Sequence, residues 1–304
     1  KIDCKEFDTA YDEAEYIAHS INSFVRKGVF SYGDSAVLYR TNAQSRLLEE
    51  RFVRENIPYK IVGGVNFYAR KEIKDLLCYL KTIDNAQDDL AVKRIINVPK
   101  RGIGATTIAK VQDYADENGM SFYAALRQAE EISTLSKATA TKIRPFVTFI
   151  QMLRSKLPYI SVEQLMDEII EDTGYVAELD AEGTDEARAR IENIDELISK
   201  IVAYEESVEQ PTLSGFLEEV ALIADIDNLE EDSDYVVLMT LHSAKGLEFP
   251  NVYLAGMEDG LFPSYMTITS DDPTEVEEER RLCYVGITRA REHLTLTSAR
   301  MRMT

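Results

Sequence analysis

The run Tyr235–Leu241 (YVVLMTL) is apolar and rich in β-branched residues, and it constrains the fold more than any other segment of the chain. A strand that alternates apolar and polar residues can leave one face in water, but this run cannot. Strands that are buried on both faces belong mostly to parallel sheets, which helices cover on each side. The sequence therefore predicts an α/β domain in which this segment is an interior strand.

The first 66 residues show the same kind of architecture. Apolar residues at helical spacing in Ile17–Val25 predict a helix that Gly28 closes. We expect a buried strand at Ala36–Tyr39, a helix through Leu47–Asn56 and a second strand at Tyr59–Val62. Alternation of helix and strand at this spacing favours a covered parallel sheet.

The last part of the chain returns to this pattern. Asn251–Ala255 and Leu294–Thr297 are predicted strands, and Thr274–Thr288 is a predicted charged helix between them. Both ends of the chain therefore contribute strands to one sheet.

The middle of the chain has helical periodicity almost throughout. Its clearest helix begins with a capping box at Ser161 and ends at Gly174. We therefore expect an α/β domain made from residues 1–66 and 232–304, interrupted by an all-helical inserted domain at residues 67–231.

Composition limits the function classes. The net charge of −20 argues against a nucleic-acid binder, because such proteins usually carry a basic surplus. Cys4, Cys78 and Cys283 lie far apart without metal-ligand spacing, so we expect reduced thiols of a cytoplasmic protein and no metal site. No apolar run reaches the roughly 20 residues that span a bilayer, and we expect no secretory signal.

The nucleotide-binding machinery of a P-loop enzyme is missing. A P-loop requires a Gly-Lys dipeptide, and the chain contains none. The acidic pairs Asp12-Glu13 and Asp195-Glu196 lie in polar helical surroundings, whereas magnesium-binding acids end an apolar strand. We therefore expect no ATP hydrolysis by this chain alone.

Three segments carry a family resemblance. They are Val37–Arg46 (VLYRTNAQSR), Thr240–Phe249 (TLHSAKGLEF) and Glu277–Glu292 (EEERRLCYVGITRARE). In this order they resemble the second RecA-like domain of superfamily 1 DNA helicases of the PcrA/UvrD type. The similarity extends over essentially the whole chain.

The resemblance implies a RecA-like fold and the C-terminal motor half of an ATP-dependent helicase or translocase that moves 3′ to 5′ on single-stranded DNA. ATP and Mg²⁺ would be cofactors of the complete enzyme, and this part would bind neither tightly. Expected partners are single-stranded and duplex DNA, the first RecA-like domain, which would lie upstream, and other repair or replication proteins.

The resemblance also assigns nucleotide contacts. Arg289 would be the arginine finger that reaches the γ-phosphate, and Glu248 would hydrogen-bond the ribose, with Gly246 beside it in the same segment. A rigid guanidinium is suited to the charge of a transferring phosphoryl group. Alternatively, Arg289 could interact with the helix dipole and with the acidic run at residues 277–279. Glu248 could be an ordinary solvated glutamate.

Four residues would contact single-stranded DNA by the same resemblance: Arg40, Asn42, Thr240 and His242. A cation, amide, hydroxyl or imidazole at a strand end can bond a phosphate or a base. His242 could instead satisfy loop carbonyls, and Asn42 could cap the helix that follows it.

The segment Pro99–Gly104 resembles a helix-hairpin-helix turn for duplex DNA. Gly102 and Gly104 would let the backbone approach a phosphate, and Thr107, at the start of the following helix with its free N–H groups, would contact it. Lys100 and Arg101 would add charge, without sequence preference. A plain structural turn is the alternative.

Two other functions stay open. The chain could be a non-catalytic module that binds DNA or protein, with the helical region as the interface. It could also belong to the recombination helicase-nucleases, which would predict a C-terminal nuclease with clustered cysteines; the sequence shows none before Thr304.

Overall fold

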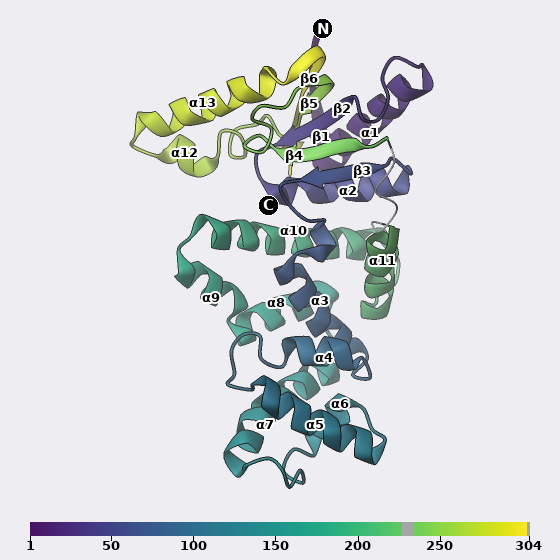
Figure 1. Ribbon diagram of the computed structural model, residues 1–304, viewed down its shortest axis with the longest axis vertical. Coiled ribbons are helices and arrows are strands. Elements are labelled where there is room, and N and C mark those ends of the chain that lie inside the picture. The colour runs from purple at the N-terminus through teal and green to yellow at the C-terminus, as the bar shows by residue number, and fades with distance from the viewer. Residues whose placement is uncertain (227–233, 303–304) are drawn as a thin grey trace. The chain divides into compact units, whose positions relative to one another are not determined.

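The computed structural model describes residues 1–226 and 234–302, and side chains at residues 224–226 are not described. The chain forms two compact units, which are described separately below (Figure 1). One unit contains Lys1–Arg70 and Ile223–Thr304, and the other contains Lys71–Leu222. The expected domain boundary between residues 231 and 232 lies outside the described residues.

The first unit is built on a six-stranded sheet with the order β1-β6-β5-β2-β4-β3, and every neighbouring pair in it is parallel. The expected α/β class with a parallel sheet is therefore confirmed. The strands are β1 (Ile2–Thr9), β2 (Ser35–Tyr39), β3 (Tyr59–Val62), β4 (Val236–Thr240), β5 (Phe249–Leu254) and β6 (Ala290–Met301).

Strand β1 was not expected from the sequence. Its residues, IDCKEFDT, are mostly polar, and most of them are exposed. It lies at the edge of the sheet, where it pairs with β6 alone, from Ile2 beside Leu294 to Thr9 beside Met301. An edge strand needs no apolar run, so the usual signal was absent.

The central strands divide their side chains between two cores. Val37 and Tyr39 of β2 pack in a cluster with residues of α1 (Ala10–Arg26) and α2 (Ser45–Arg54). Ala36 and Leu38 face the other way, and residues of α13 (Pro273–Ile287) pack against their cluster. Helices thus cover both faces, as the apolar run in β4 requires.

Gly286 lets α13 approach the sheet closely. A Cβ atom at this position would lie 2.9 Å from Leu254 Cδ2 and would also collide with the Leu241 side chain. The helix therefore packs on the ends of β4 and β5 only because residue 286 has no side chain.

The second unit is helical, and its buried residues include Ile73, Leu80, Ile143 and Leu197. The capping box at Ser161 is present, since Ser161 Oγ accepts from the Gln164 N–H at 3.1 Å and Gln164 Oε1 accepts from the Ser161 N–H at 3.0 Å. Its helices, the last of which runs into the first unit, are α3 (Lys71–Asp84), α4 (Asp89–Ile95), α5 (Ala105–Asn118), α6 (Phe122–Arg127), α7 (Lys137–Lys156), α8 (Val162–Thr173), α9 (Tyr175–Glu182), α10 (Asp185–Ser207) and α11 (Leu213–Ile226).

A short helix, α12 (Tyr265–Thr269), and two 3₁₀ turns, Asn42–Gln44 and Phe67–Ala69, complete the described elements. In the described parts of the chain, no helix is both long enough and apolar enough to cross a bilayer.

Candidate functional site

The carboxyl ends of β2 and β4 lie side by side, because these strands are parallel neighbours and Tyr39 pairs with Thr240. Arg40 follows β2 directly, and His242 follows β4 after Leu241. The sheet thus brings Arg40 next to Thr240 and His242, which lie about 200 positions further along the sequence. This edge of a parallel sheet is where open α/β folds bind ligands.

Arg40 is held by a carboxylate that the sequence did not single out. Its Nε lies 3.0 and 3.2 Å from the two carboxylate oxygens of Glu279, and its Nη2 lies 2.9 Å from Glu279 Oε1. The Arg40 side chain is 26% exposed, and Glu279 is 8% exposed overall. Paired bonds of this kind fix a guanidinium in both position and plane.

The turn that presents Arg40 is fixed by Gln44. Gln44 Oε1 accepts from the backbone N–H groups of Arg40 and Thr41, each at 2.9 Å. Thr41 is the N-cap of the 3₁₀ turn and Gln44 is that of α2, so the alternative in which Asn42 caps the following helix is wrong. The Asn42 side chain lies near Gly64, where a built Cβ would come within 3.6 Å of its Oδ1.

Thr240 and His242 line the same edge. Thr240 Oγ1 lies 3.0 Å from Ser243 Oγ and accepts from the Ser243 N–H at 3.3 Å, which shapes the turn after β4. Partial burial lowers the pKa of His242, and the nearby charge of Arg40 lowers it further, whereas Glu279 opposes the shift. The imidazole is therefore favoured in its neutral form.

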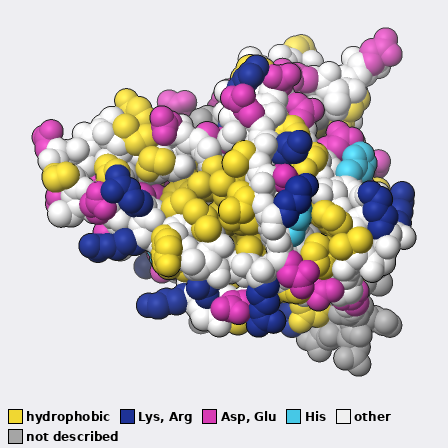
Figure 2. Space-filling model, turned by 90° about the horizontal axis from the view of Figure 1, so that it is seen from above, with side chains coloured by type: hydrophobic (Ala, Val, Ile, Leu, Met, Phe, Trp, Pro, Cys, Tyr) yellow, Lys and Arg dark blue, Asp and Glu magenta, His cyan; other side chains and the backbone are white. Residues whose placement is uncertain are grey.

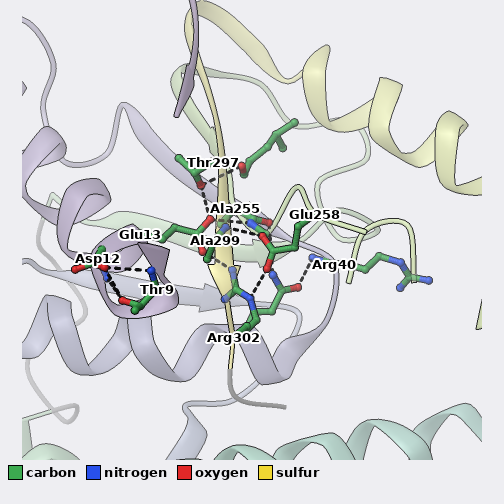
Figure 3. A network of polar contacts seen from close by, with 12 residues as sticks. Thr9, Asp12, Glu13, Arg40, Ala255, Glu258, Thr297, Ala299 and Arg302 are labelled. Atoms are coloured by element: carbon green, nitrogen blue, oxygen red, sulfur yellow. Dashed lines mark hydrogen bonds and ion pairs between the residues drawn. The ribbon is translucent and has the colours of Figure 1, made fainter. Parts of the chain in front are cut away.

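A buried polar network stabilises the same edge from the side of β5 and β6 (Figure 3). Glu13 accepts from the Gly256 N–H at 2.9 Å and from Thr297 Oγ1 at 2.6 Å, and it pairs with Arg302. Arg302 Nε donates to Glu258 at 2.6 Å. The Arg40 side chain points away from this network, but Gln44 joins the two regions, because its Nε2 lies 3.5 Å from the Ala255 carbonyl oxygen.

Arg289 and Glu248 lie at the amino ends of the strands, which is the opposite end of the sheet from Arg40. They precede β6 and β5, and the Phe249 N–H donates to the Arg289 carbonyl oxygen at 2.9 Å. The segment Thr240–Phe249 thus runs from one edge to the other. Thr240 and His242 lie where the segment leaves β4, whereas Glu248 lies where it enters β5.

The Arg289 guanidinium is bound to the end of α13. Its Nε donates to the Val285 carbonyl oxygen, its Nη1 to the Leu247 carbonyl oxygen and its Nη2 to Thr288 Oγ1, each at 2.9 Å. These contacts match the helix-dipole alternative. The acidic run at residues 277–279 has other partners: Arg280, Arg281 and Arg40.

Glu248 forms an exposed ion pair with Arg291, whose Nε lies 3.1 Å from Glu248 Oε2. Gly246, two residues earlier, has a φ of +88°, which favours glycine. Gly246 and Glu248 flank Leu247, whose carbonyl oxygen Arg289 contacts, so the three predicted nucleotide residues lie close together.

In the helical unit, Gly102 has a φ of +69°, and a Cβ there would lie 3.3 Å from Lys142 Nζ. Lys142 is a cation that the sequence did not single out. Gly104 caps α5 without a side-chain bond, and the Thr107 N–H donates to the Gly104 carbonyl oxygen at 3.0 Å. Lys100 is exposed on the same loop.

Arg101 points into the fold. Its Nη1 lies 2.9 Å from the Ile95 carbonyl oxygen and 3.1 Å from that of Val98, and its Nη2 donates to Tyr79 Oη at 2.6 Å. The guanidinium also lies 5.4 Å from the centre of the Phe146 ring. These contacts satisfy carbonyl groups at the end of α4, so we drop Arg101 from the predicted phosphate contacts.

Comparison with known proteins gives consistent matches. A family model described as the UvrD-like helicase C-terminal domain matches residues 1–301. The chain is 48% identical over 305 residues to proteins named ATP-dependent DNA helicase PcrA from Staphylococcus epidermidis and Staphylococcus aureus. These alignments cover 100% of this chain and 41% of each relative, so the chain spans about two fifths of their length.

Proposed function

This chain belongs to the UvrD-like helicase C-terminal domain family, and on that basis we propose that it is the C-terminal motor half of an ATP-dependent 3′–5′ DNA helicase or translocase. The relatives named PcrA support a helicase as the complete protein. We further propose that residues 67–231 are the inserted helical domain and that the protein acts in the cytoplasm with repair or replication proteins.

The observation that carries the DNA role is the cluster at the carboxyl ends of β2 and β4. We propose that Arg40, Asn42, Thr240 and His242 contact single-stranded DNA there. Arg40 supplies a fixed positive charge, and the Thr240 hydroxyl and the neutral His242 ring supply hydrogen-bonding groups. Contacts of this kind hold the backbone and are independent of sequence, which suits a translocase.

The nucleotide role belongs to the opposite edge. We propose that Arg289 acts as an arginine finger on ATP bound by the first RecA-like domain, and that Glu248 hydrogen-bonds the ribose beside Gly246. Mg²⁺ would neutralise phosphate charge in the complete enzyme. For Arg289 to reach a phosphate, it must exchange the Leu247 and Val285 carbonyl oxygens for phosphate oxygens.

Exposed apolar side chains near Arg289 support a neighbouring domain at this edge. Leu247, Tyr284 and Ile287 are 40%, 68% and 36% exposed. Figure 2 shows apolar side chains gathered in the middle of this view, with charged side chains of both signs around them. Such a surface is costly to leave in water and is suited to a partner domain that opens and closes on it.

In the helical unit we propose a sequence-independent contact with duplex DNA. Lys142 lies beside the loop that contains Lys100, Gly102 and Gly104. The first N–H groups of α5, before that of Thr107, can bind an anion there. Arg101 supports the loop from inside.

Two measurements test the function. The chain alone should bind a single-stranded oligonucleotide, with an affinity that falls as salt rises. It should show no ATPase activity above background, because it has no Gly-Lys dipeptide for a P-loop. DNA-stimulated hydrolysis by this chain would contradict the proposal, and binding of protein partners without any DNA binding would favour the interaction module.

A further inference from the structure

Glu279 is the one glutamate of the run Glu277–Glu279 that turns inward. Glu277 and Glu278 are exposed and pair with Arg280 and Arg281 on the same helix. Glu279 is 8% exposed and reaches across to Arg40, which follows β2. A buried carboxylate is costly without a partner, so this pairing is a fixed feature of the fold.

The geometry of the pair leaves Arg40 able to bind a second anion. Glu279 occupies the side of the guanidinium that carries Nε and one N–H of Nη2. The other side, with Nη1 and the second N–H of Nη2, makes no hydrogen bond within the described residues. A guanidinium can bind one oxyanion through each side. Glu279 therefore orients Arg40 without using up its donors.

We propose that Glu279 is a positioning residue for the single-stranded DNA contact, which holds the free side of Arg40 toward a backbone phosphate. The inference rests on the proposed DNA role of Arg40. It also gives α13 two roles, because Glu279 lies in its first half and Ile287, roughly 12 Å further along the axis, ends the helix beside Arg289. One rigid helix thus joins the DNA contact to the proposed finger.

The two possible roles of Glu279, as a charge and as a positioning residue, predict opposite effects of Glu279→Gln on DNA affinity. If Glu279 acted only through its charge, its removal would relieve repulsion of the phosphate backbone and tighten binding. If Glu279 positions Arg40, the loss of the paired bond frees the guanidinium to adopt other rotamers, and binding weakens. The sign of the effect separates these cases.

The experiment measures the affinity of this chain for a fluorescent single-stranded oligonucleotide at several salt concentrations. We expect Glu279→Gln to weaken binding about three- to tenfold. Glu278→Gln makes the same change of charge on the same helix and should bind equally well or slightly more tightly. Glu279→Asp, which keeps the carboxylate, should recover part of the loss, and thermal unfolding of each variant confirms that it is folded.

A double-mutant cycle completes the test. Arg40→Ala should weaken binding and reduce the slope of log affinity against log salt by about 0.7. Adding Glu279→Gln to Arg40→Ala should cause no further loss, because the glutamate acts through the arginine. If Arg40→Ala leaves binding unchanged, the proposed DNA contact is wrong. If Arg40→Ala weakens binding while Glu279→Gln tightens it, or if the two losses add, the positioning role is wrong and the DNA contact stands.

Discussion

The Arg289 Nη1 donates to the Leu247 carbonyl oxygen at 2.9 Å, and this bond ties the end of α13 to the loop that precedes β5. Both residues lie at the amino edge of the sheet, away from the Arg40 cluster. The proposed finger is thus bound to its own domain in this structure, and the proposed ribose contact at Glu248 is the next residue after its acceptor.

The first prediction concerns Arg289 in the complete enzyme. Arg289→Ala should lower DNA-stimulated ATP hydrolysis by about 10³- to 10⁵-fold, because the guanidinium stabilises charge that develops during phosphoryl transfer. Affinity for single-stranded DNA should change little. Single-turnover hydrolysis and oligonucleotide binding measure the two effects, and Arg280→Ala on the same helix is the control. Weakened DNA binding with normal turnover would show that Arg289 has been misassigned.

The second prediction separates Arg101 from Lys100. Arg101→Ala should destabilise the helical unit by about 2–4 kcal/mol, because several carbonyl groups lose their buried partner. Lys100→Ala should leave stability unchanged and should reduce the salt slope of duplex binding by about 0.9. Denaturant unfolding and duplex titrations measure these effects. An unchanged slope for Lys100→Ala would remove the duplex contact from this loop.

The third prediction concerns helix packing at Gly286. Helix propensity alone predicts that Gly286→Ala stabilises the protein by up to about 1 kcal/mol. Because the added Cβ would collide with the Leu241 and Leu254 side chains, we expect instead a loss of about 1–3 kcal/mol. Urea unfolding of the two proteins shows whether the free energy of unfolding rises or falls. A more stable variant would mean that α13 can shift away from the sheet.

The fourth prediction concerns pH. Because burial and Arg40 lower the pKa of His242 below its usual 6.5, the unfolded chain takes up this proton first as the pH falls. The contribution of His242 to stability should therefore decrease as the pH drops below about 6.5. Between about pH 7.5 and 5.5, the wild-type protein should lose more stability than His242→Gln. Equal losses in urea unfolding at the two pH values would contradict this.

The pKa of His293 is shifted in the same direction as that of His242, so His293 must stay unchanged in both proteins of that comparison. Burial lowers its pKa, and Asp3 opposes the shift. The difference between wild type and His242→Gln then reports His242 alone.

Most of the secondary structure could be predicted because its signals are local. Strand β3 has the predicted bounds Tyr59–Val62, and Gly174 ends α8 with a φ of +67°. Periodicity, caps and glycine conformations depend on neighbours a few residues away. Strand β1 was missed because a polar edge strand lacks such a signal and is fixed only by its pairing with β6.

Residue patterns alone were enough to infer a buried parallel sheet, strands from both ends of the chain and three segments of one helicase family. What the candidate side chains touch depends on the tertiary structure. Arg101 turns inward, Glu279 reaches Arg40 and Arg289 binds the Leu247 carbonyl oxygen. Two of these contacts join residues 239 and 42 positions apart, and such partners are chosen by strand order and helix packing rather than by the residues nearby.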